Sequence, residues 1–558
     1  MMGEKRKSKD ILWKIFLILL VISILFYAGY YLYLNLAEYS LVMDSDIAAE
    51  ALLARTMWES KSLIPTSWIG SSETRILSVS ALGSLFYGLC GSMTLSAGLS
   101  CSVFIILILV LYAILGRKSH LSRISILVSL LLILSLPGSI RHAEILYLYA
   151  GYYAPHVAVM LFTLSFYLDE SLPKNTSAII SGKKGQDKTK RCAISGYIIV
   201  FFLAFAMSLS GMRIMLILYA PLFVVEFLRW VMSLLCRRFP WRSLSRRKGA
   251  GIALGCIVFS ILGTLAPTSV SLPVSSNFRY GFSKMKEEVL EDCIDCLGWN
   301  DSGSSVRFIL LVFLGMSIVM LIYSLILPGF RKIHRSLGCS QSEVPKKEEQ
   351  DIARKAICLL FFWISLIVTV FAVSFLTIES VWRYYFMLYF ILSYSVALLV
   401  DRIGEMNGKK TIKALLGSVV CLFCFVFSFL QWDEQLDQTV SSKETKEDTT
   451  QIVSWMLENG IEYGYSTFET ANRMTIEADG AVQISAVDGM DTLGICRWLT
   501  DTRWYVPSLS YDMDTAYIVP KSEEDLFAIQ LSLHDDYEEV LETEEYIVYL
   551  APHNYTDS

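Results

Sequence analysis

Charged residues are scarce in this chain of 558 residues: Asp, Glu, Lys and Arg together make up 18% of it, and hydrophobic residues make up 54%. That balance excludes an ordinary soluble domain, in which about a quarter of the residues carry charge. Many apolar runs approach the roughly 20 residues that a helix needs to cross a bilayer. The sequence therefore predicts an α-helical polytopic membrane protein.

Cysteine occurs twelve times, but it is scattered and lies mostly within apolar runs, where it acts as a small apolar group. On the predicted outer side, Cys293 and Cys296 form one CxxC pair, in EDCIDCLGWN. A single pair does not complete a zinc site, so a local disulfide or two free thiols is expected there. A nucleic-acid partner has no support in the sequence either.

Counting the apolar runs gives eleven predicted transmembrane helices. The first run is too long for a signal peptide and lacks a small-residue cleavage site, so it is expected to stay as a membrane anchor. Residues 76–90 are also apolar and are expected to form a helix at the membrane interface. The predicted spans lie near residues 11–36, 94–116, 123–137, 145–168, 192–210, 212–235, 249–271, 307–328, 356–378, 383–400 and 413–431.

Positive charge is distributed unevenly over the connections between these spans. If the amino terminus is cytoplasmic, the inside segments hold most of the 48 lysines and arginines, as the positive-inside rule requires. An odd number of spans then places the tail outside a plasma membrane (N-in/C-out). The chain is thus divided into a transmembrane domain, residues 1–431, whose first outer loop covers 37–93, and an extracytoplasmic domain, residues 432–558.

The tail has a different pattern from the rest. Its apolar runs YGYST, AVQISAV, TAYIVP and EYIVYLA alternate with helix-like stretches such as SEEDLFAIQLSL, which is typical of a small α+β domain. It contains no phosphate-binding loop, zinc cluster or nucleophile elbow. We expect it to cap the transmembrane domain or to hold a substrate.

An acidic pair lies where the first span would meet water: LVMDSDIAAE contains Asp44 and Asp46. One interpretation is structural, because Asp44 or Ser45 could cap the helix IAAEALLARTMWE. The other is chemical, because a carboxylate above the lipid headgroups could deprotonate a hydroxyl group. Both interpretations stay open at this point.

The rest of the first loop, ARTMWESKSLIPTSWIGSSETRILS, adds aromatic and charged residues. Trp58 and Trp68 could belong to the interfacial belt of aromatic residues. Sugar rings also stack on tryptophan faces, and carboxylates such as Glu73 accept hydrogen bonds from sugar hydroxyl groups. Trp68 and Glu73 are accordingly candidates for binding a carbohydrate substrate.

Arginines lie near the outer ends of four predicted spans, where positive charge is otherwise rare: Arg141 in SIRHAEIL, Arg213 in LSGMRIML, Arg279 in NFRYGF and Arg383 in VWRYYFML. An arginine at a membrane edge can simply extend its side chain to water. Its planar fork is also the natural partner of a phosphate or pyrophosphate.

These features together predict transfer of a sugar from a polyprenyl-phosphate carrier. Arginines would neutralise the phosphate leaving group and a carboxylate would deprotonate the acceptor hydroxyl, so that the sugar moves in one displacement with inversion. Other classes stay open: a flippase or transporter, an O-antigen-type ligase or polymerase, or a receptor or scaffold. Whether the acceptor is a glycan, a lipid or a protein is not indicated.

The layout resembles the GT-C glycosyltransferases, which include protein O-mannosyltransferases, aminoarabinose transferases and oligosaccharyltransferase catalytic subunits. The stretch SDIAAEALLARTMWESKSLIPTSWIGSSETRIL is similar to the first outer loop of a bacterial group of membrane glycosyltransferases, and YYAPH (152–156), GMRIM and WRYYF also resemble that group. The resemblance covers nearly the whole chain. It implies a GT-C-like fold and an enzyme that uses a polyprenyl-phosphate sugar donor in a bacterial membrane.

The resemblance also implies roles for single carboxylates. The first-loop acid of the family matches Asp46, with Asp44 as the alternative. Glu144 in RHAEIL matches a second acidic site in a later outer loop. It would bind a divalent cation or the acceptor, or it would pair with Arg141.

Phosphate binding is implied for another motif, because Arg383 and Tyr384 resemble the arginine-tyrosine element near the lipid phosphate in GT-C enzymes. Arg213 is the second candidate. The first loop lacks the adjacent Asp-Glu or Asp-Asp pair of better characterised members, so no cofactor is certain and dependence on Mg²⁺ or Mn²⁺ stays open. The sequence also lacks a WWD-type motif, which argues against transfer of an oligosaccharide to asparagine.

Overall fold

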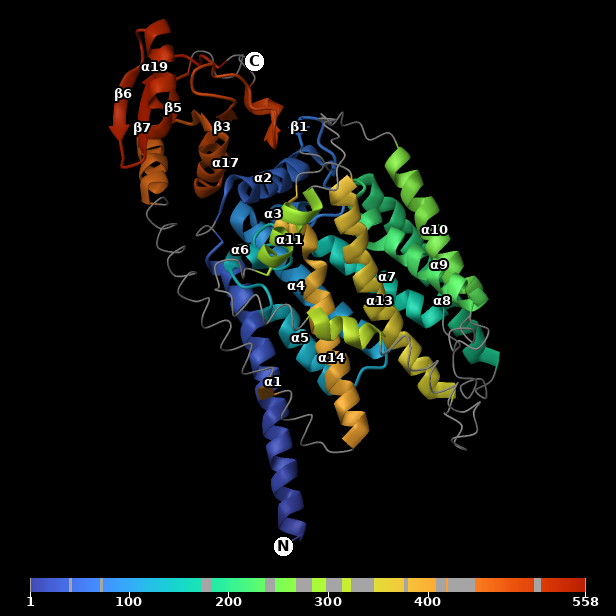
Figure 1. Ribbon diagram of the computed structural model, residues 1–558. Helices are drawn as coiled ribbons and strands as arrows, with labels where there is room; N and C mark the ends of the chain where they lie inside the picture. The colour runs from blue at the N-terminus through green and yellow to red at the C-terminus, as the bar shows by residue number, and fades with distance from the viewer. Residues whose placement is uncertain are drawn as a thin grey trace.

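The protein consists of a helical bundle with a small sheet domain at one end (Figure 1). This arrangement comes from a computed structural model. The structure describes residues 2–39, 43–70, 74–171, 183–235, 246–266, 284–297, 314–322, 346–375, 380–407, 418–419, 447–505 and 513–556.

Six helices in these ranges are long and apolar enough to cross a membrane, which confirms a multi-pass membrane protein. Four of them are single helices. The π-helical turn Met215–Tyr219 precedes another, and the 3-10 turn Trp382–Tyr385 precedes the last. In chain order the helices are α1 (Met2–Ala37), α4 (Met93–Lys118), α9 (Ala220–Leu235), α10 (Arg246–Leu265), α13 (Lys346–Phe375) and α14 (Met387–Asn407).

Other predicted spans are shorter or begin elsewhere. Helix α5 (Arg123–Ser135) is short, as expected, and α8 (Lys183–Leu209) ends close to its predicted limit. Helix α7 (Ala154–Ser171) begins well after the predicted start at residue 145, because residues 144–153 form a series of turns. The spans expected near 307–328 and 413–431 fall largely outside the described residues, so the number eleven stays a prediction.

In the described part of the bundle, four further helices are not among the predicted spans. Helix α2 (Ser45–Ser60) and helix α3 (Val79–Cys90) come from the first loop, and α3 confirms the helix expected over 76–90. The short helix α6 (Ile140–Ala143) precedes the turns that lead to α7, and α11 (Lys284–Asp295) lies in the later loop. The pair Cys293 and Cys296, at the end of α11 and just after it, consists of two free thiols.

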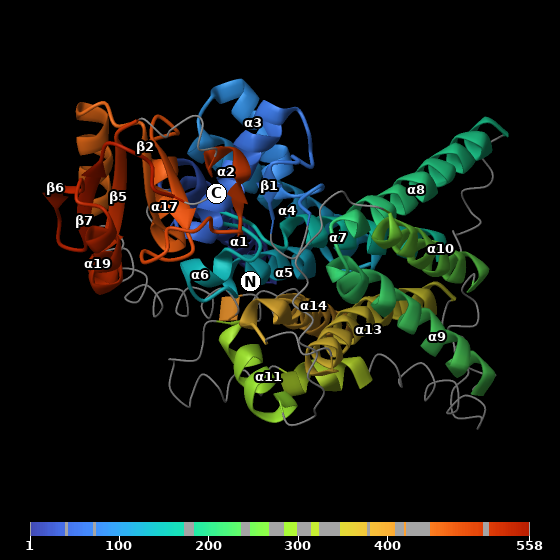
Figure 2. The same cartoon turned by 90° about the horizontal axis from the view of Figure 1, so that it is seen from above.

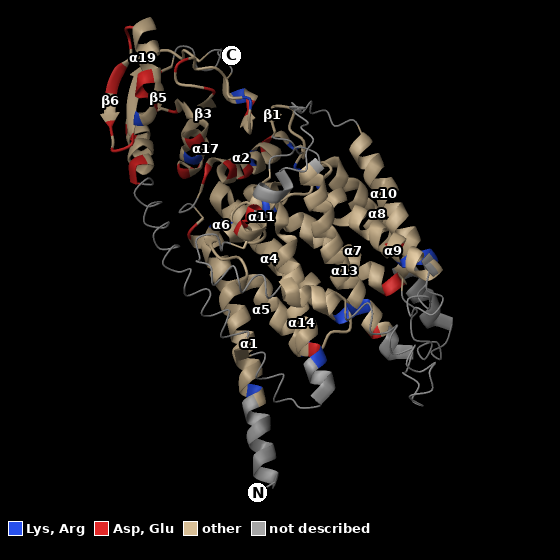
Figure 3. Cartoon of the chain, viewed as in Figure 1, with Lys and Arg blue, Asp and Glu red and all other residues tan. Residues whose placement is uncertain are grey.

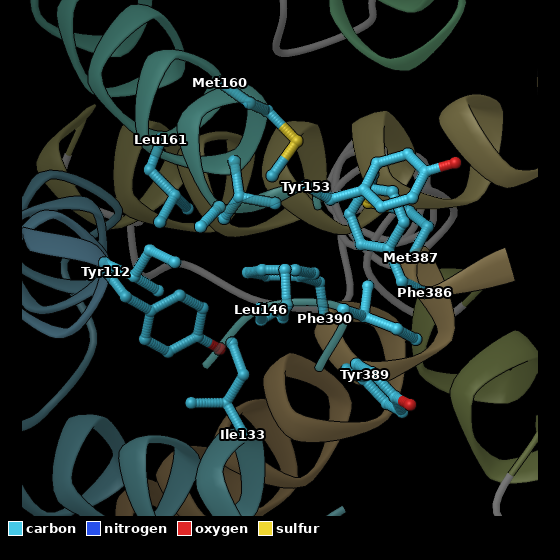
Figure 4. Packing of buried hydrophobic residues seen from close by; sticks show 14 of the residues in the cluster. Tyr112, Ile133, Leu146, Tyr153, Met160, Leu161, Phe386, Met387, Tyr389 and Phe390 are labelled. Carbon is cyan, nitrogen blue, oxygen red and sulfur yellow. The ribbon is translucent and has the colours of Figure 1, made fainter. Parts of the chain in front are cut away.

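Aromatic and branched side chains from α4, α5, α7 and α14 form the core of the bundle (Figure 4). The rings of Tyr112 and Phe390 have centroids 5.9 Å apart, and those of Tyr153 and Phe386 are 4.8 Å apart. Such tilted ring pairs add about 1 kcal/mol each to the burial of their apolar area. The interior of the bundle between these helices is therefore packed with side chains.

Two ion pairs lie inside the described part of the bundle. Lys355 of α13 contacts Asp401 of α14, which also accepts a hydrogen bond from the backbone amide of Ser122 at 3.0 Å. In α9, Arg229 is paired with Glu226. Pairing of this kind is what burial of an ion requires, because an isolated charge in a low dielectric costs several kcal/mol.

The tail folds as a five-stranded mixed sheet with helices on both faces. Strands β3, β2 and β5 run parallel, and β5, β7 and β6 are antiparallel. A helix over 447–458 and helix α17 (Phe468–Glu477) cover one face, and α19 (Glu524–Leu533) covers the other. The strands are β2 (Tyr463–Thr467), β3 (Gln483–Val487), β5 (Thr515–Pro520), β6 (Glu538–Glu542) and β7 (Tyr546–Ala551).

All four strands expected in the tail are present, and so is the helix expected over SEEDLFAIQLSL. Strand β6, with the sequence EEVLE, was not expected, because an exposed edge strand needs no regular apolar pattern. The boundary expected at residue 431 lies outside the described residues.

The sheet domain lies beside α2, at the end of the bundle opposite the start of α1 (Figures 1 and 2). Charged side chains are concentrated in this domain and at the two ends of the bundle, with few between them (Figure 3). This is the distribution that a bilayer around the middle of the bundle would require.

Candidate active site

Asp44 caps helix α2. Its backbone is extended (φ −89°, ψ 177°), and its carboxylate accepts a hydrogen bond from the Ile47 amide at 2.7 Å. The structural interpretation of the acidic pair is therefore confirmed for Asp44. Capping uses one carboxylate oxygen and leaves the second for other contacts.

Asp46 lies in the first turn of the same helix and is half-buried. Among the residues that the structure describes, its carboxylate makes no hydrogen bond and no ion pair. Asp46 is thus a carboxylate that is held in place by its helix and has no partner in the described part of the chain.

The turns over residues 144–153 face this acidic pair. The side chain of Asn35, at the end of α1, donates to the Tyr147 carbonyl at 2.8 Å and accepts from the Tyr149 amide at 2.9 Å. Tyr149 has a positive φ of 50°, a conformation that costs non-glycine residues about 1 kcal/mol or more. Gly151 follows with φ 48°, and a Cβ there would lie 3.2 Å from Val79. Asn35 therefore stabilises the strained turn that contains Glu144 and Tyr152.

Three of the outer arginines stack on aromatic rings next to this turn. The guanidinium of Arg383 lies 5.3 Å from the centre of the Tyr152 ring, and that of Arg213 lies 4.6 Å from the centre of the Tyr153 ring. Arg141 lies 5.3 Å from the centre of the Trp382 ring. Stacking fixes the plane of a guanidinium while its N–H groups stay directed outward.

Asp44, Asp46, Glu144, Arg141 and Arg383 are close enough to influence one another electrostatically. The pKa of Asp44 is raised by burial, and Asp46 raises it further, whereas Arg383 lowers it. The Glu144 pKa is raised well above its usual range, first by burial and then by Asp44, and Arg141 and Arg383 oppose this. We call Asp44, Asp46, Glu144, Arg141 and Arg383 the acid–arginine cluster.

Glu144 is buried, with 8% of its surface exposed. No ion pair joins it to Arg141, although the structure describes both residues. The pairing left open for these two residues is therefore not found. Raising the pKa of a carboxyl favours its protonated form, which can donate a hydrogen bond.

In the described ranges, no three His, Cys, Asp or Glu side chains lie close enough together to hold a metal ion. The described residues therefore do not form a site for a divalent cation. The carboxylates of the cluster are considered only as proton acceptors and donors.

The tail contacts the first loop beside the cluster. The Ser45 hydroxyl donates to the carbonyl of Phe468 at the start of α17, and the next residue, Glu469, raises the pKa of Asp44. At the other end of α2, Thr56 donates to Asp501 at 3.1 Å. The expectation that the tail caps the transmembrane domain agrees with these contacts.

Other predicted site residues lie elsewhere. Trp68 forms strand β1 (Trp68–Ile69), which pairs with β4 (Thr500–Asp501) of the tail. Its ring packs edge-on against Trp504 at 6.3 Å and is 7% exposed, so its observed role is packing between loop and tail. Tyr384, beside Arg383, is half-buried. Glu73 and Arg279 lie outside the described residues.

Sequence reasoning missed Tyr152 and Glu469 as neighbours of the acidic pair. Tyr152 could have been found, because YYAPH was already part of the resemblance. Nothing in the sequence connects position 469 with position 44, since a helix in the tail and a loop near the amino terminus meet only in the folded chain.

No protein-family model matches this sequence, and no curated protein sequence is significantly similar to it. Several solved structures have a limited similarity to this chain over most of its length. ArnT from Cupriavidus metallidurans in the apo state is 12% identical with a TM-score of 0.48, over 96% of this chain and 97% of that one. ArnT bound to undecaprenyl phosphate is 12% identical with a TM-score of 0.46, over the same shares.

The Archaeoglobus fulgidus oligosaccharyltransferase in complex with Zn and sulfate is 14% identical with a TM-score of 0.46, over 95% of this chain and 72% of that one. At these identities and TM-scores the likeness carries no conclusion about the chemistry of this protein.

Proposed function

We propose that this protein is a membrane glycosyltransferase that moves a hexose, with inversion, from a polyprenyl-phosphate donor to an acceptor hydroxyl at the outer face of a bacterial plasma membrane. The observation that carries the proposal is the acid–arginine cluster. It places a carboxylate without a partner among the described residues, Asp46, in the same site as a stacked arginine, Arg383. These are the two groups that the reaction needs.

Asp46 is the proposed general base. The acceptor hydroxyl gives its proton to a carboxylate oxygen of Asp46, and the hydroxyl oxygen forms a bond to the anomeric carbon of the sugar. The bond between that carbon and the phosphate oxygen breaks, and its electron pair stays on the phosphate. Asp44 is a positioning residue, because its cap fixes the first turn of α2.

Arg383 stabilises the charge that develops on the leaving phosphate, and stacking on Tyr152 holds its guanidinium in place. Arg213, stacked on Tyr153, is the second phosphate contact. Glu144 in its protonated form donates a hydrogen bond to a phosphate oxygen, where an ionised carboxylate would repel it. Each of these groups acts most strongly where water is excluded.

The test is sugar transfer by the full chain in nanodiscs, with radiolabelled polyprenyl-phosphate hexoses as donors and a membrane extract as acceptor. Asp46→Asn is expected to abolish transfer, whereas Asp44→Asn retains it, because asparagine caps a helix about as well as aspartate. Loss in Asp44→Asn with retention in Asp46→Asn would exchange the two roles. Folded wild-type protein that releases polyprenyl phosphate from no donor would overturn the proposal and favour transport or scaffolding.

A further inference from the structure

Glu50 is the acidic residue of α2 that is buried in the protein. It lies one turn after Asp46, and residues four apart on a helix lie on the same face. Asp46 is half-buried, whereas only 8% of the surface of Glu50 is exposed. A carboxylate buried to this extent needs a partner, because an isolated buried charge is costly.

The partners of Glu50 come from the first loop and from α3. Arg75 forms an ion pair with one carboxylate oxygen at 2.8 Å, and the hydroxyl of Ser80, in α3, donates to the other. The residue before Arg75 is also fixed, because the Thr74 hydroxyl donates to the carbonyl of Leu209 at the end of α8 at 2.7 Å. Glu50 therefore connects α2 to α3 and, through the segment that carries Arg75, to α8.

The same ion pair lies next to the ring on which Arg383 stacks. Glu50, Arg75 and Tyr152 line one small cavity, which has room for about one water molecule. The guanidinium of Arg383 lies 5.3 Å from the centre of the Tyr152 ring. The contacts of Glu50 thus lie between the helix that carries Asp46 and the ring that holds Arg383.

We propose that the Glu50–Arg75 ion pair positions Asp46 with respect to Arg383, so that the base and the phosphate-binding arginine act on the same bound donor. The inference rests on the proposed function and adds two positioning residues, which act through α2 and Tyr152 rather than on the reacting atoms. A buried ion pair adds little net stability, because the lost hydration offsets the attraction between the charges. What it provides here is a fixed geometry, and a displacement of about 1 Å can cost about 100-fold in rate.

The test measures sugar transfer by the full chain in nanodiscs, per molecule that binds a short prenyl phosphate, so that unfolded protein is not counted. Glu50→Gln keeps an acceptor for Ser80 and removes the ion pair. It is expected to lower kcat about 10- to 100-fold and to change the Kd for prenyl phosphate by less than about twofold. Glu59→Gln is the matched control: Glu59 lies on the same helix in a partly exposed ion pair with Arg55 at 2.7 Å, and its loss should leave kcat unchanged.

Two further measurements separate positioning from stability. Arg75→Gln should lower kcat as Glu50→Gln does, and the variant with both changes should lose no more than either single variant, because the two residues act as one pair. Amide hydrogen exchange over residues 45–50 reads the position of α2 without turnover. It should become faster in Glu50→Gln and stay unchanged in Glu59→Gln.

Wild-type turnover per binding molecule in Glu50→Gln, or additive losses in the variant with both changes, would overturn the inference. So would a large loss of prenyl phosphate affinity in Arg75→Gln, because Arg75 would then hold the phosphate. Unchanged exchange over residues 45–50 in Glu50→Gln would overturn it whether or not wild type transfers sugar. Absence of transfer by folded wild type would contradict the proposed function, whereas transfer by wild type with an unchanged kcat in Glu50→Gln would contradict this inference alone.

Discussion

Asp44 and Asp46 are two residues apart, yet their carboxylates differ in what they contact. Asp44 is engaged by the Ile47 amide, and Asp46 has no partner in the described part of the chain. A helix start offers such a division, because the capping residue faces the backbone while residues of the first turn face outward. The pair is thus both a structural and a chemical feature, and the two interpretations of the sequence do not compete.

Arg383 is the residue whose loss should weaken donor binding most directly. Arg383→Ala is expected to lower kcat/KM for transfer by about 10- to 100-fold, the size of one lost charge-assisted hydrogen-bond set. Arg383→Lys should recover part of this, because lysine keeps the charge but loses the stacked planar fork. The measurement is initial rate against donor concentration in nanodiscs.

Arg117 gives the control for that experiment, as an exposed arginine in the last turn of α4 at the other end of the bundle. Arg117→Ala should leave kcat/KM unchanged. A wild-type rate in Arg383→Ala would remove Arg383 from the phosphate site.

Glu144 should make the protein less stable as the pH rises. Burial and Asp44 raise its pKa well above the value of 4.5 that an unfolded chain would show. Above that value the unfolded state loses the proton that the folded state keeps, so stability falls by up to about 1.4 kcal/mol per pH unit until the folded group ionises. Glu144→Gln should therefore unfold at a higher temperature than wild type at pH 7 and at a similar temperature near pH 4.

Thermal unfolding in detergent at several pH values measures this difference. A gap between the two proteins that stays constant from pH 4 to pH 8 would show that Glu144 does not titrate as described. A wider gap at low pH would mean that its pKa is lowered rather than raised.

Some residues of the site could be predicted because their type is unusual for their place. Carboxylates and arginines near the outer ends of apolar spans are rare, which made Asp44, Asp46 and Arg383 candidates, and the family resemblance ranked Asp46 and Arg383 first. His156 could not be assigned in this way, since it lies in a run whose pattern is explained by helix packing. Its buried Nδ1 lacks a partner in the described structure, which only the folded chain shows.

Helix α2 is the element that connects the candidate active site to the tail. Its first residue, Ser45, contacts α17, and its last turns contact β4 and the following 3-10 turn through Thr56 and Glu59. The helix is thus held at both ends by a domain that lies more than 400 positions later in the sequence. Its position, and with it that of Asp46, depends on the tail.

Asp501 should be the main contributor to this connection. It is fully buried and accepts hydrogen bonds from Thr56 at 3.1 Å and from the side chain of Arg503 at 2.7 Å. Asp501→Ala leaves the buried Thr56 hydroxyl without its acceptor, whereas Arg503 keeps Glu59 and contact with water, so the contact should weaken by about 1–3 kcal/mol. Hydrogen exchange over residues 61–70 should then become faster.

Glu59→Ala is the comparison, because Glu59 is partly exposed and forms surface ion pairs with Arg55 and Arg503. Such pairs contribute about 0–1 kcal/mol, so exchange should change little. Unchanged protection in Asp501→Ala would show that apolar packing alone holds the loop to the tail.

At the scale of elements, the pattern of apolar residues predicted most strands of the tail, but it did not predict where every helix begins. Alternation located β5 and β7 because their side chains pack on both faces of the sheet in turn. The start of α7 was misplaced because residues 145–153 are as apolar as a span, although a strained turn uses them. Strand β1, two residues long, has no pattern to detect.

Across the whole molecule, the tail and the start of α1 lie at opposite ends of the bundle (Figure 1). We predict that alkaline phosphatase fused to the carboxy terminus is active in a bacterial host and that green fluorescent protein fused there is dark. Fusions within the predicted cytoplasmic segment 169–191 serve as the opposite control. A fluorescent carboxy-terminal fusion would place the tail inside and contradict the sidedness of the proposed reaction.

The membrane character of the whole chain could be predicted, because span length and charge asymmetry are read directly from the sequence. The contacts between helices could not be predicted in the same way. Helices α1 and α4 approach so closely at Gly98 that a Cβ there would lie 2.0 Å from the Asn35 carbonyl oxygen. No run of residues indicates that this glycine, rather than another, marks a contact, so the arrangement of helices could not be predicted from periodicity.

The pairing of β1 with β4 has a consequence for biogenesis. A ribosome releases the first loop long before it synthesises residues 500 and 501, and the loop cannot acquire its partner strand until synthesis is almost complete. Nascent chains inserted in the membrane would therefore carry Asp46 on a helix that packs on α3 and α4 but still lacks its contacts with the tail. The first loop is thus expected to reach its final position only after synthesis of the whole chain, and a truncated product would lack it.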